Sequence, residues 1–392
     1  MNFSSKIKTN NYFLSQPHQP FFILGIINAI VFISLFALSY KNIIHITMPI
    51  SVLHAYSLIF LVFTNFFIGF LFTTFPRFNQ SETISKEYYL KIFYANTFGA
   101  ILFLAGVLYM HFLVLVAMGI LLFSQIFMVL KLCAIYRKGR AVEKVDSFWI
   151  LIAQIFGIFG HALFILSALG VLKNSISIYV SFYSYLIFLT FVVAQRMIPF
   201  FSHSLVAKNR KLVVIIFILL LLKIIFLLSD HIYFIKITEI VLDMFIGAFT
   251  LKEFLRWKLL SLNTPAILWV LHLGLFWFPI SFLLSAFSSV LAQVFDVDFY
   301  FLSIHLVALG FLTTIFIGFA TRVVLGHSGQ APHADNFARN IFLLVQLILF
   351  LRAIYSINIG LNWGINFIFD ISISAWLVLF ILWGYRYGKI LI

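Results

Sequence analysis

One stretch of the sequence decides the fold class. Residues 304–330 read IHLVALGFLTTIFIGFATRVVLGHSGQ, and up to residue 320 the only ionisable group is a single histidine. A membrane-spanning helix needs about 20 predominantly apolar residues, because each adds about 1.5 Å to a path across about 30 Å of hydrocarbon. Arg322 marks the end of the apolar stretch, and Gly326 is a residue typical of helix ends. The stretch therefore predicts a transmembrane helix followed by a tight polar turn.

The composition of the whole chain agrees with this reading. Of 392 residues, 63% are hydrophobic and only 10% are charged, whereas soluble domains carry roughly 25% charged residues. So much apolar surface requires a lipid bilayer as its solvent. The formal net charge of +14 does not indicate a nucleic-acid partner, because the basic residues stand in short groups between apolar runs. That distribution is typical of the loops of membrane proteins.

The sequence contains twelve apolar segments of spanning length. No long polar region separates them, so we expect one polytopic domain over residues 1–392, with residues 1–19 as an N-terminal segment in the cytoplasm. The predicted spans lie near residues 20–40, 51–75, 89–109, 112–135, 147–170, 176–197, 212–229, 232–254, 265–290, 299–324, 337–357 and 365–386.

The basic residues predict the orientation. If the N-terminus is cytoplasmic, all but five of the 26 lysines and arginines fall on the cytoplasmic side. Cytoplasmic loops of membrane proteins carry this excess of positive charge, so both termini are predicted to lie inside. The exceptions are Lys41, Lys173, Lys223, Lys236 and Arg352.

Histidines within the spans are candidate metal ligands, because imidazole is a common ligand of haem iron and copper. Counted from the span ends, His54 and His305 share a level a turn or two below the outer surface. His161 lies near the middle of its span and could adjoin them, whereas His272 lies nearer the cytoplasmic side. Two imidazoles at one depth either hold a haem iron from both faces or are two unrelated hydrogen-bonded side chains, and their spacing alone leaves both open.

Other polar residues also have two interpretations. Arg196 and Arg322 lie at cytoplasmic span ends, where each is either an interface anchor or, for Arg196, a counter-charge for a carboxylate such as a haem propionate. His327 either binds a metal or hydrogen-bonds within its turn. On the eighth predicted span, residues 236, 239 and 243 form a stripe of one lysine and two carboxylates, which is either a proton or cation path or an internal ion-paired stripe.

Cys133 is the only cysteine, which excludes an intrachain disulfide and covalent haem attachment through paired cysteines. Any haem would therefore be held noncovalently, and haem b is the natural expectation.

Four motifs occur in an order that resembles the NnrS family. They are HAYSLIFLVFTNFFIGFLFTTFPRF (residues 54–78), AQRMIPFFS (194–202), LHLGLFWFPISFLL (271–284) and the stretch quoted first (304–330). The resemblance covers almost the whole chain. It implies a twelve-span protein of the bacterial inner membrane that contains haem and copper and is linked to nitric oxide and nitrosative stress.

The resemblance also implies site residues. His54 matches the first histidine of a His-Ala-His pattern of the family, whose second histidine is Tyr56 here. His272, His305 and His327 match histidines of the later motifs, and Arg196 and Arg322 match family arginines. Core subunits of haem–copper oxidases, by analogy, also have twelve spans and take haem ligands from the second and the tenth.

These observations predict a membrane protein that binds haem b, with copper as a second expected metal, and acts in gas binding, electron transfer or protection from iron–nitrosyl damage. The expected partners are lipid and a diatomic gas such as nitric oxide, and the redox partner is unknown. The alternative is a secondary transporter of a small ion or metabolite, for which residues 239 and 243 would be the coupling groups. A membrane sensor or assembly factor without catalysis is a third possibility, and whether the protein is an enzyme stays open.

Overall fold

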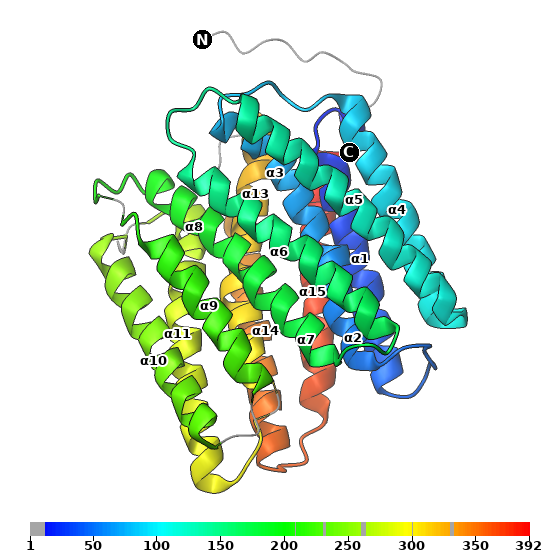
Figure 1. Cartoon of the computed structure of the whole chain (residues 1–392), viewed down its shortest axis with the longest axis vertical. Coiled ribbons are helices and arrows are strands. Elements are labelled where there is room, and N and C mark those ends of the chain that lie inside the picture. Colours follow the sequence, from blue (N-terminus) through cyan, green and yellow to red (C-terminus); the bar gives the residue numbers. More distant parts are fainter. Residues whose placement is uncertain (1–11, 208, 230–232, 260–263, 300, 330–332) are drawn as a thin grey trace.

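Helices account for nearly all of the computed structural model, which describes residues 12–207, 209–229, 233–259, 264–299, 301–329 and 333–392 (Figure 1). No β-strand occurs among these residues. The elements are η1 (Tyr12–Leu14), α1 (His18–Tyr40), α2 (Ile50–Tyr56), η2 (Ser57–Phe63), α3 (Thr64–Phe78), α4 (Lys86–Tyr109), α5 (His111–Lys138), α6 (Val145–Ala168), α7 (Asn174–Tyr179), η3 (Val180–Ile187), α8 (Phe188–Phe201), α9 (Leu212–Leu228), α10 (Tyr233–Arg256), α11 (Ala266–Phe295), α12 (Leu302–His305), η4 (Leu306–Thr313), α13 (Thr314–His327), α14 (Asn336–Gly360) and α15 (Phe367–Leu391).

Ten continuous helices in the described part of the chain are long and apolar enough to cross a membrane. They coincide with ten of the twelve predicted spans. The other two predicted spans are also helical, but α9 has only 17 residues and α10 carries six charged side chains. The count of twelve and the side on which the termini lie therefore remain predictions. The C-terminus lies at the same end of the bundle as the start of α1 (Figure 1).

Three continuous helices form the centre of the bundle. They are Ile50–Phe78, Asn174–Phe201 and Leu302–His327, which we call the central spans. Between 78% and 89% of the apolar stretch in each is buried within the protein, against at most 56% in the other seven. The helices around them, with α4 and α10 at opposite edges in Figure 1, shield them from lipid.

Each central span contains one π-helical segment, which is η2, η3 or η4. A π segment frees carbonyl groups from the regular α-helical pattern, and threonine hydroxyls bond several of them. Thr64 donates to the Ile59 carbonyl at 2.7 Å, and Thr313 donates to the Ala308 carbonyl at 2.7 Å, five residues back in each case. Such segments are rare and are frequent at functional sites.

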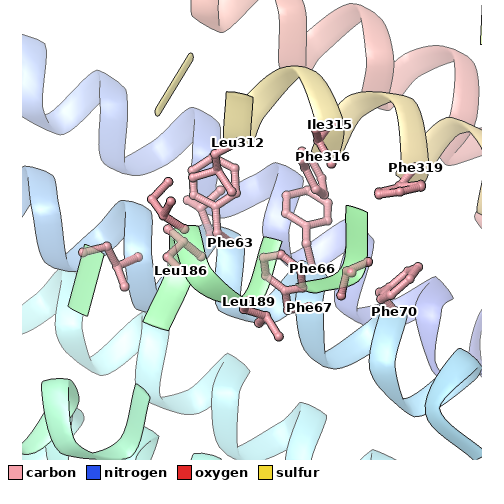
Figure 2. Close-up of a cluster of buried hydrophobic side chains, with 14 of the residues drawn as sticks. Phe63, Phe66, Phe67, Phe70, Leu186, Leu189, Leu312, Ile315, Phe316 and Phe319 are labelled. Carbon is pink, nitrogen blue, oxygen red and sulfur yellow. The ribbon is translucent and has the colours of Figure 1, made fainter. Parts of the chain in front are cut away.

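A cluster of apolar side chains fills the space between the central spans (Figure 2). The rings of Phe66 and Phe316 lie 4.1 Å apart at its centre. We call this cluster the apolar plug; its labelled members in Figure 2 are Phe63, Phe66, Phe67, Phe70, Leu186, Leu189, Leu312, Ile315, Phe316 and Phe319.

Glycine allows one central span to approach its neighbour closely. The backbone of Gly310 in η4 faces the ring of Trp277 in α11, and a methyl group added at Gly310 would lie only 2.9 Å from that ring. Helix contacts through small residues are common in membranes. The close approach brings α11 against η4, which carries the start of the tenth predicted span.

Candidate functional site

A cavity of about 440 Å³ opens at the end of the central spans that lies away from the start of α1 and the end of α15. Its walls come from α1, the first halves of all three central spans, α14 and α15. Binding sites for small molecules typically have volumes of about 300–1,000 Å³, apolar walls and a few polar groups. The polar groups here include His54, His305, Arg352, Tyr179 and Tyr355.

His54 and His305 face one another across this cavity. Each lies near the start of its central span, just before η2 or η4, and their ring centres are 6.2 Å apart with planes inclined by 25°. The Nδ1–H of His305 donates to the Phe301 carbonyl at 2.8 Å. This hydrogen bond fixes the tautomer, so that Nε2 keeps the lone pair that a metal requires. Nδ1 of His54 is buried without a hydrogen-bond partner. The ring of Phe36 packs against the His54 ring, with 4.3 Å between the two ring centres.

The separation of the two rings has a simple chemical meaning. A metal–nitrogen bond of about 2.0 Å, plus about 1.1 Å from ring nitrogen to ring centre, places two imidazoles on opposite sides of one ion with centres roughly 6.2 Å apart. The observed 6.2 Å is close to this value. Within the described residues, no group of three or more His, Cys, Asp or Glu side chains could hold a metal.

Arg352 of α14 adds a positive charge to the same cavity. Its guanidinium donates to Ser356 at 2.8 Å and lies 5.1 Å from the ring centre of Tyr355. The Tyr355 hydroxyl is in turn 2.8 Å from that of Tyr40. In the sequence, Arg352 stands out only as an exception to the charge distribution. The signal was its isolation in the apolar run LILFLRAIYS (347–356), because ionisable residues within spans are functional candidates.

His161 does not line the cavity, although its predicted depth allowed it to adjoin the pair. Its Nδ1 lies 2.9 Å from Oε1 of Gln125 in α5, and its Nε2 lies 2.8 Å from the hydroxyl of Tyr56. Phe60 stacks on its ring at 4.1 Å. Both ring nitrogens are thus occupied within the protein, outside the cavity that holds His54 and His305.

The predicted arginines and His272 lie towards the opposite end of the bundle. Arg196 forms an ion pair with Asp146 at 3.0 Å and lies over the Phe78 ring. Arg322 stacks on Phe201, with its guanidinium carbon 3.9 Å from the ring centre.

His272 is hydrogen-bonded to the hydroxyl of Ser202, which follows α8, at 2.7 Å. None of these three predicted residues lines the cavity, so the structure separates them from His54 and His305.

A second histidine pair lies at the cytoplasmic end predicted by the sequence. The ring centres of His327, the last residue of α13, and His18, the first residue of α1, are 4.8 Å apart with planes inclined by 41°. His18 is only 3% exposed, and its Nδ1 has no hydrogen-bond partner. The sequence points to His327 through its motif but not to His18, because a residue just before an apolar segment resembles part of a solvated terminus.

The charged stripe of α10 differs from its predicted form. Lys236 is exposed, and the lysine bonded to Glu239 and Asp243 is Lys223 of the neighbouring α9. Spacing along one helix suggested Lys236, whereas packing of two helices supplies Lys223.

The helices and the histidine-containing cavity together define the class: this is a multi-pass, all-helical membrane protein. The model of the family described as NnrS protein matches residues 12–392. The chain belongs to the NnrS family, as its four motifs predict. A comparison with curated proteins finds no match.

Proposed function

We propose that this protein binds haem b between His54 and His305 and acts in the response of bacteria to nitric oxide and nitrosative stress. The single observation that carries the haem assignment is the 6.2 Å separation of the two imidazole rings across a cavity of ligand size. The link to nitric oxide follows from family membership.

The residues present suit a porphyrin better than a bare ion. A porphyrin supplies four nitrogen ligands in its plane, so two imidazoles complete the coordination of its iron. The cavity walls are mainly apolar, as a macrocycle requires. Arg352 would neutralise a propionate, because a guanidinium forms strong charge-assisted hydrogen bonds with carboxylates. Arg196 lies outside the cavity and forms an ion pair with Asp146.

Two imidazole ligands restrict what the site can do. When bound, haem b supplies a one-electron redox centre and an iron to which a diatomic gas can bind. With His54 and His305 both in place, no position on that iron is open, so a gas would have to replace one imidazole. The arrangement therefore favours electron transfer, or slow gas binding, over rapid turnover.

We further propose that α9 and α10 also cross the membrane, which gives twelve spans with both termini in the cytoplasm of the bacterial cell. This follows from the excess of basic residues on one side. The cavity of His54 and His305 then opens towards the periplasmic side, and the pair His18–His327 lies towards the cytoplasm.

The haem assignment is tested with protein purified from haem-replete cells. We expect a Soret band with noncovalently extractable haem in the wild type, and loss of most of it in His54→Ala and in His305→Ala. Matched controls are His161→Ala, whose side chain is buried outside the cavity, and His45→Ala, whose side chain is exposed between α1 and α2. Equal haem content in all five proteins would contradict the assignment.

We propose that the copper that the family resemblance implies binds between His18 and His327. Two imidazoles that bind one ion at a tetrahedral angle have ring centres roughly 5 Å apart, and the observed value is 4.8 Å. We expect one copper ion per chain, lost in His327→Ala and in His18→Ala but retained in His203→Ala, whose side chain is exposed. Copper that is retained in both pair variants, or is absent from the wild type, would refute this site.

A further inference from the structure

A second buried polar site lies in the bundle, outside the cavity. Lys223 of α9 donates to Oε1 of Glu239 at 2.6 Å and to Oδ2 of Asp243 at 2.7 Å, both in α10. Ser285 of α11 also donates to Oδ2 of Asp243, at 2.7 Å. The side chains of Lys223 and Asp243 are each 1% exposed. We call these four residues the Lys223 cluster.

The charges in this cluster do not balance when every group is ionised. Among the residues that the structure describes, Lys223 is the only cation that forms an ion pair with the two carboxylates. Two carboxylates and one ammonium leave a formal charge of −1 in a part of the protein shielded from water. A net buried charge is strongly unfavourable, and a carboxyl group near another carboxylate usually resolves it by keeping a proton.

The proton has a specific place to bind. Oδ1 of Asp243 is buried and has no hydrogen-bond partner, whereas Oδ2 of the same side chain accepts from both Lys223 and Ser285. An ionised carboxylate with one bare oxygen is the least favourable state at such a position. A proton on Oδ1 removes the excess charge and leaves both existing hydrogen bonds intact.

The cluster also lies beside the helix that leads to the cavity. α9, which carries Lys223, packs against both α10 and η3. Tyr183 of η3 is 1% exposed. Tyr179, four residues earlier in the same span, lines the cavity that contains His54 and His305. Residues four apart project from one face of a helix, so the span that packs against α9 also reaches the cavity.

We propose that Asp243 is a membrane-embedded proton-binding site, with Oδ1 as the atom that takes up and releases the proton. The groups that bond to it are Lys223 from α9 and Ser285 from α11, and Glu239 of its own helix shares Lys223. The span that carries Tyr183 and Tyr179 provides the direction in which the proton can move, towards the cavity. The proton site does not depend on haem; its place in the membrane rests on the proposal that α10 is a span, and the direction rests on the proposed haem site.

Infrared spectroscopy of the full-length protein in lipid nanodiscs tests the proposal. A protonated carboxyl group shows a C=O stretch that shifts when exchangeable hydrogen is replaced by deuterium. We expect such a band near neutral pH, with choline as the only buffer cation, and its loss in Asp243→Asn, which keeps the shape of the side chain. Asp370→Asn is the matched control, because Asp370 forms an exposed ion pair with Lys41 and should leave the band unchanged.

Three results would overturn the proposal. They are the absence of the band at every pH at which the protein stays folded, its persistence in Asp243→Asn together with its loss in Glu239→Gln, and its disappearance when sodium replaces choline. The second would move the proton to Glu239, and the third would replace the proton by a metal cation. The Soret band of Asp243→Asn, measured on the same samples, keeps the outcome separate from that of the haem assignment.

Discussion

At the scale of single residues, Arg352 adds a positive charge to the cavity. A cationic side chain within a transmembrane helix costs about 2.5–3.5 kcal/mol near the bilayer centre, so a protein keeps one where it has a task. Here it lies on the wall of the cavity that contains His54 and His305. A propionate of the proposed haem is the anion that such a position suits.

Replacement of Arg352 by glutamine tests this role. Hydrogen bonds to charged groups contribute about 1.5–3 kcal/mol, so we expect Arg352→Gln to weaken haem binding about tenfold or more. Arg352→Lys, which keeps the charge but loses the planar guanidinium, should lie between. The measurement is titration of haem-free protein with haem.

Arg339→Gln serves as the control for this series, because Arg339 is an exposed arginine near the other end of the same helix. If Arg352→Gln bound haem as tightly as Arg339→Gln, Arg352 would have no part in the site.

Sequence alone predicted that His54 and His305 lie at one depth, because residue counts from the span ends convert directly into height. It did not predict Arg352 or Lys223 as site residues. Both lie within predicted apolar spans. The distribution of basic residues along the sequence predicts which side of the membrane a loop is on, but not which helix packs beside a given residue. The hydrogen bond that fixes the tautomer of His305 could not be predicted from the sequence either, since it depends on the backbone conformation at Phe301.

At the scale of elements, a buried hydrogen-bond chain connects three spans. Gln125 of α5, His161 of α6 and Tyr56 of α2 form it, and the side chains of all three are at most 2% exposed. The resemblance to the family implies a histidine at the position of Tyr56. In this structure its hydroxyl satisfies a ring nitrogen of His161 and thereby holds α6 against the start of the second span.

Removal of the Tyr56 hydroxyl should destabilise the bundle. Tyr56→Phe leaves a buried imidazole nitrogen without its partner, which typically costs about 1–3 kcal/mol. We expect a lower apparent melting temperature in detergent, with an unchanged Soret band. Tyr94→Phe is the control, because the side chain of Tyr94 is 57% exposed. A melting temperature equal to that of this control would show that the chain of hydrogen bonds contributes no stability.

The sequence predicted most helices to within a few residues, because apolar length defines them. It did not predict the π segments of the central spans. A π segment is retained where packing and side chains such as Thr64 compensate for the altered backbone, and those partners come from the folded state. His54 and His305 each lie just before such a segment, so part of the local geometry of the site cannot be predicted from the sequence.

At the scale of the whole molecule, the apolar plug separates two polar ends. One end holds the cavity with His54 and His305, and the other holds the pair His18–His327 (Figure 2 shows the plug between the central spans). If α9 and α10 are spans, the central ones are the second, sixth and tenth. They then recur every fourth span, although we find no sequence repeat.

Cysteine labelling tests the twelve-span arrangement. Cys133 is the only cysteine, so a Cys133→Ser background is free of thiols. In intact spheroplasts, a membrane-impermeant maleimide should label Ser229→Cys, between α9 and α10, but label Leu205→Cys, between α8 and α9, only after lysis. Labelling of both positions in intact spheroplasts, or of neither until lysis, would mean that α9 does not cross the membrane.

Electron paramagnetic resonance of the oxidised, haem-loaded protein tests the central claim most directly, because the spin state of ferric haem reports its axial ligands. Two imidazoles predict a low-spin spectrum in the wild type, and in His54→Ala and His305→Ala its conversion to a high-spin signal or its loss with the haem. A wild-type spectrum that both variants reproduce unchanged would contradict ligation by His54 and His305.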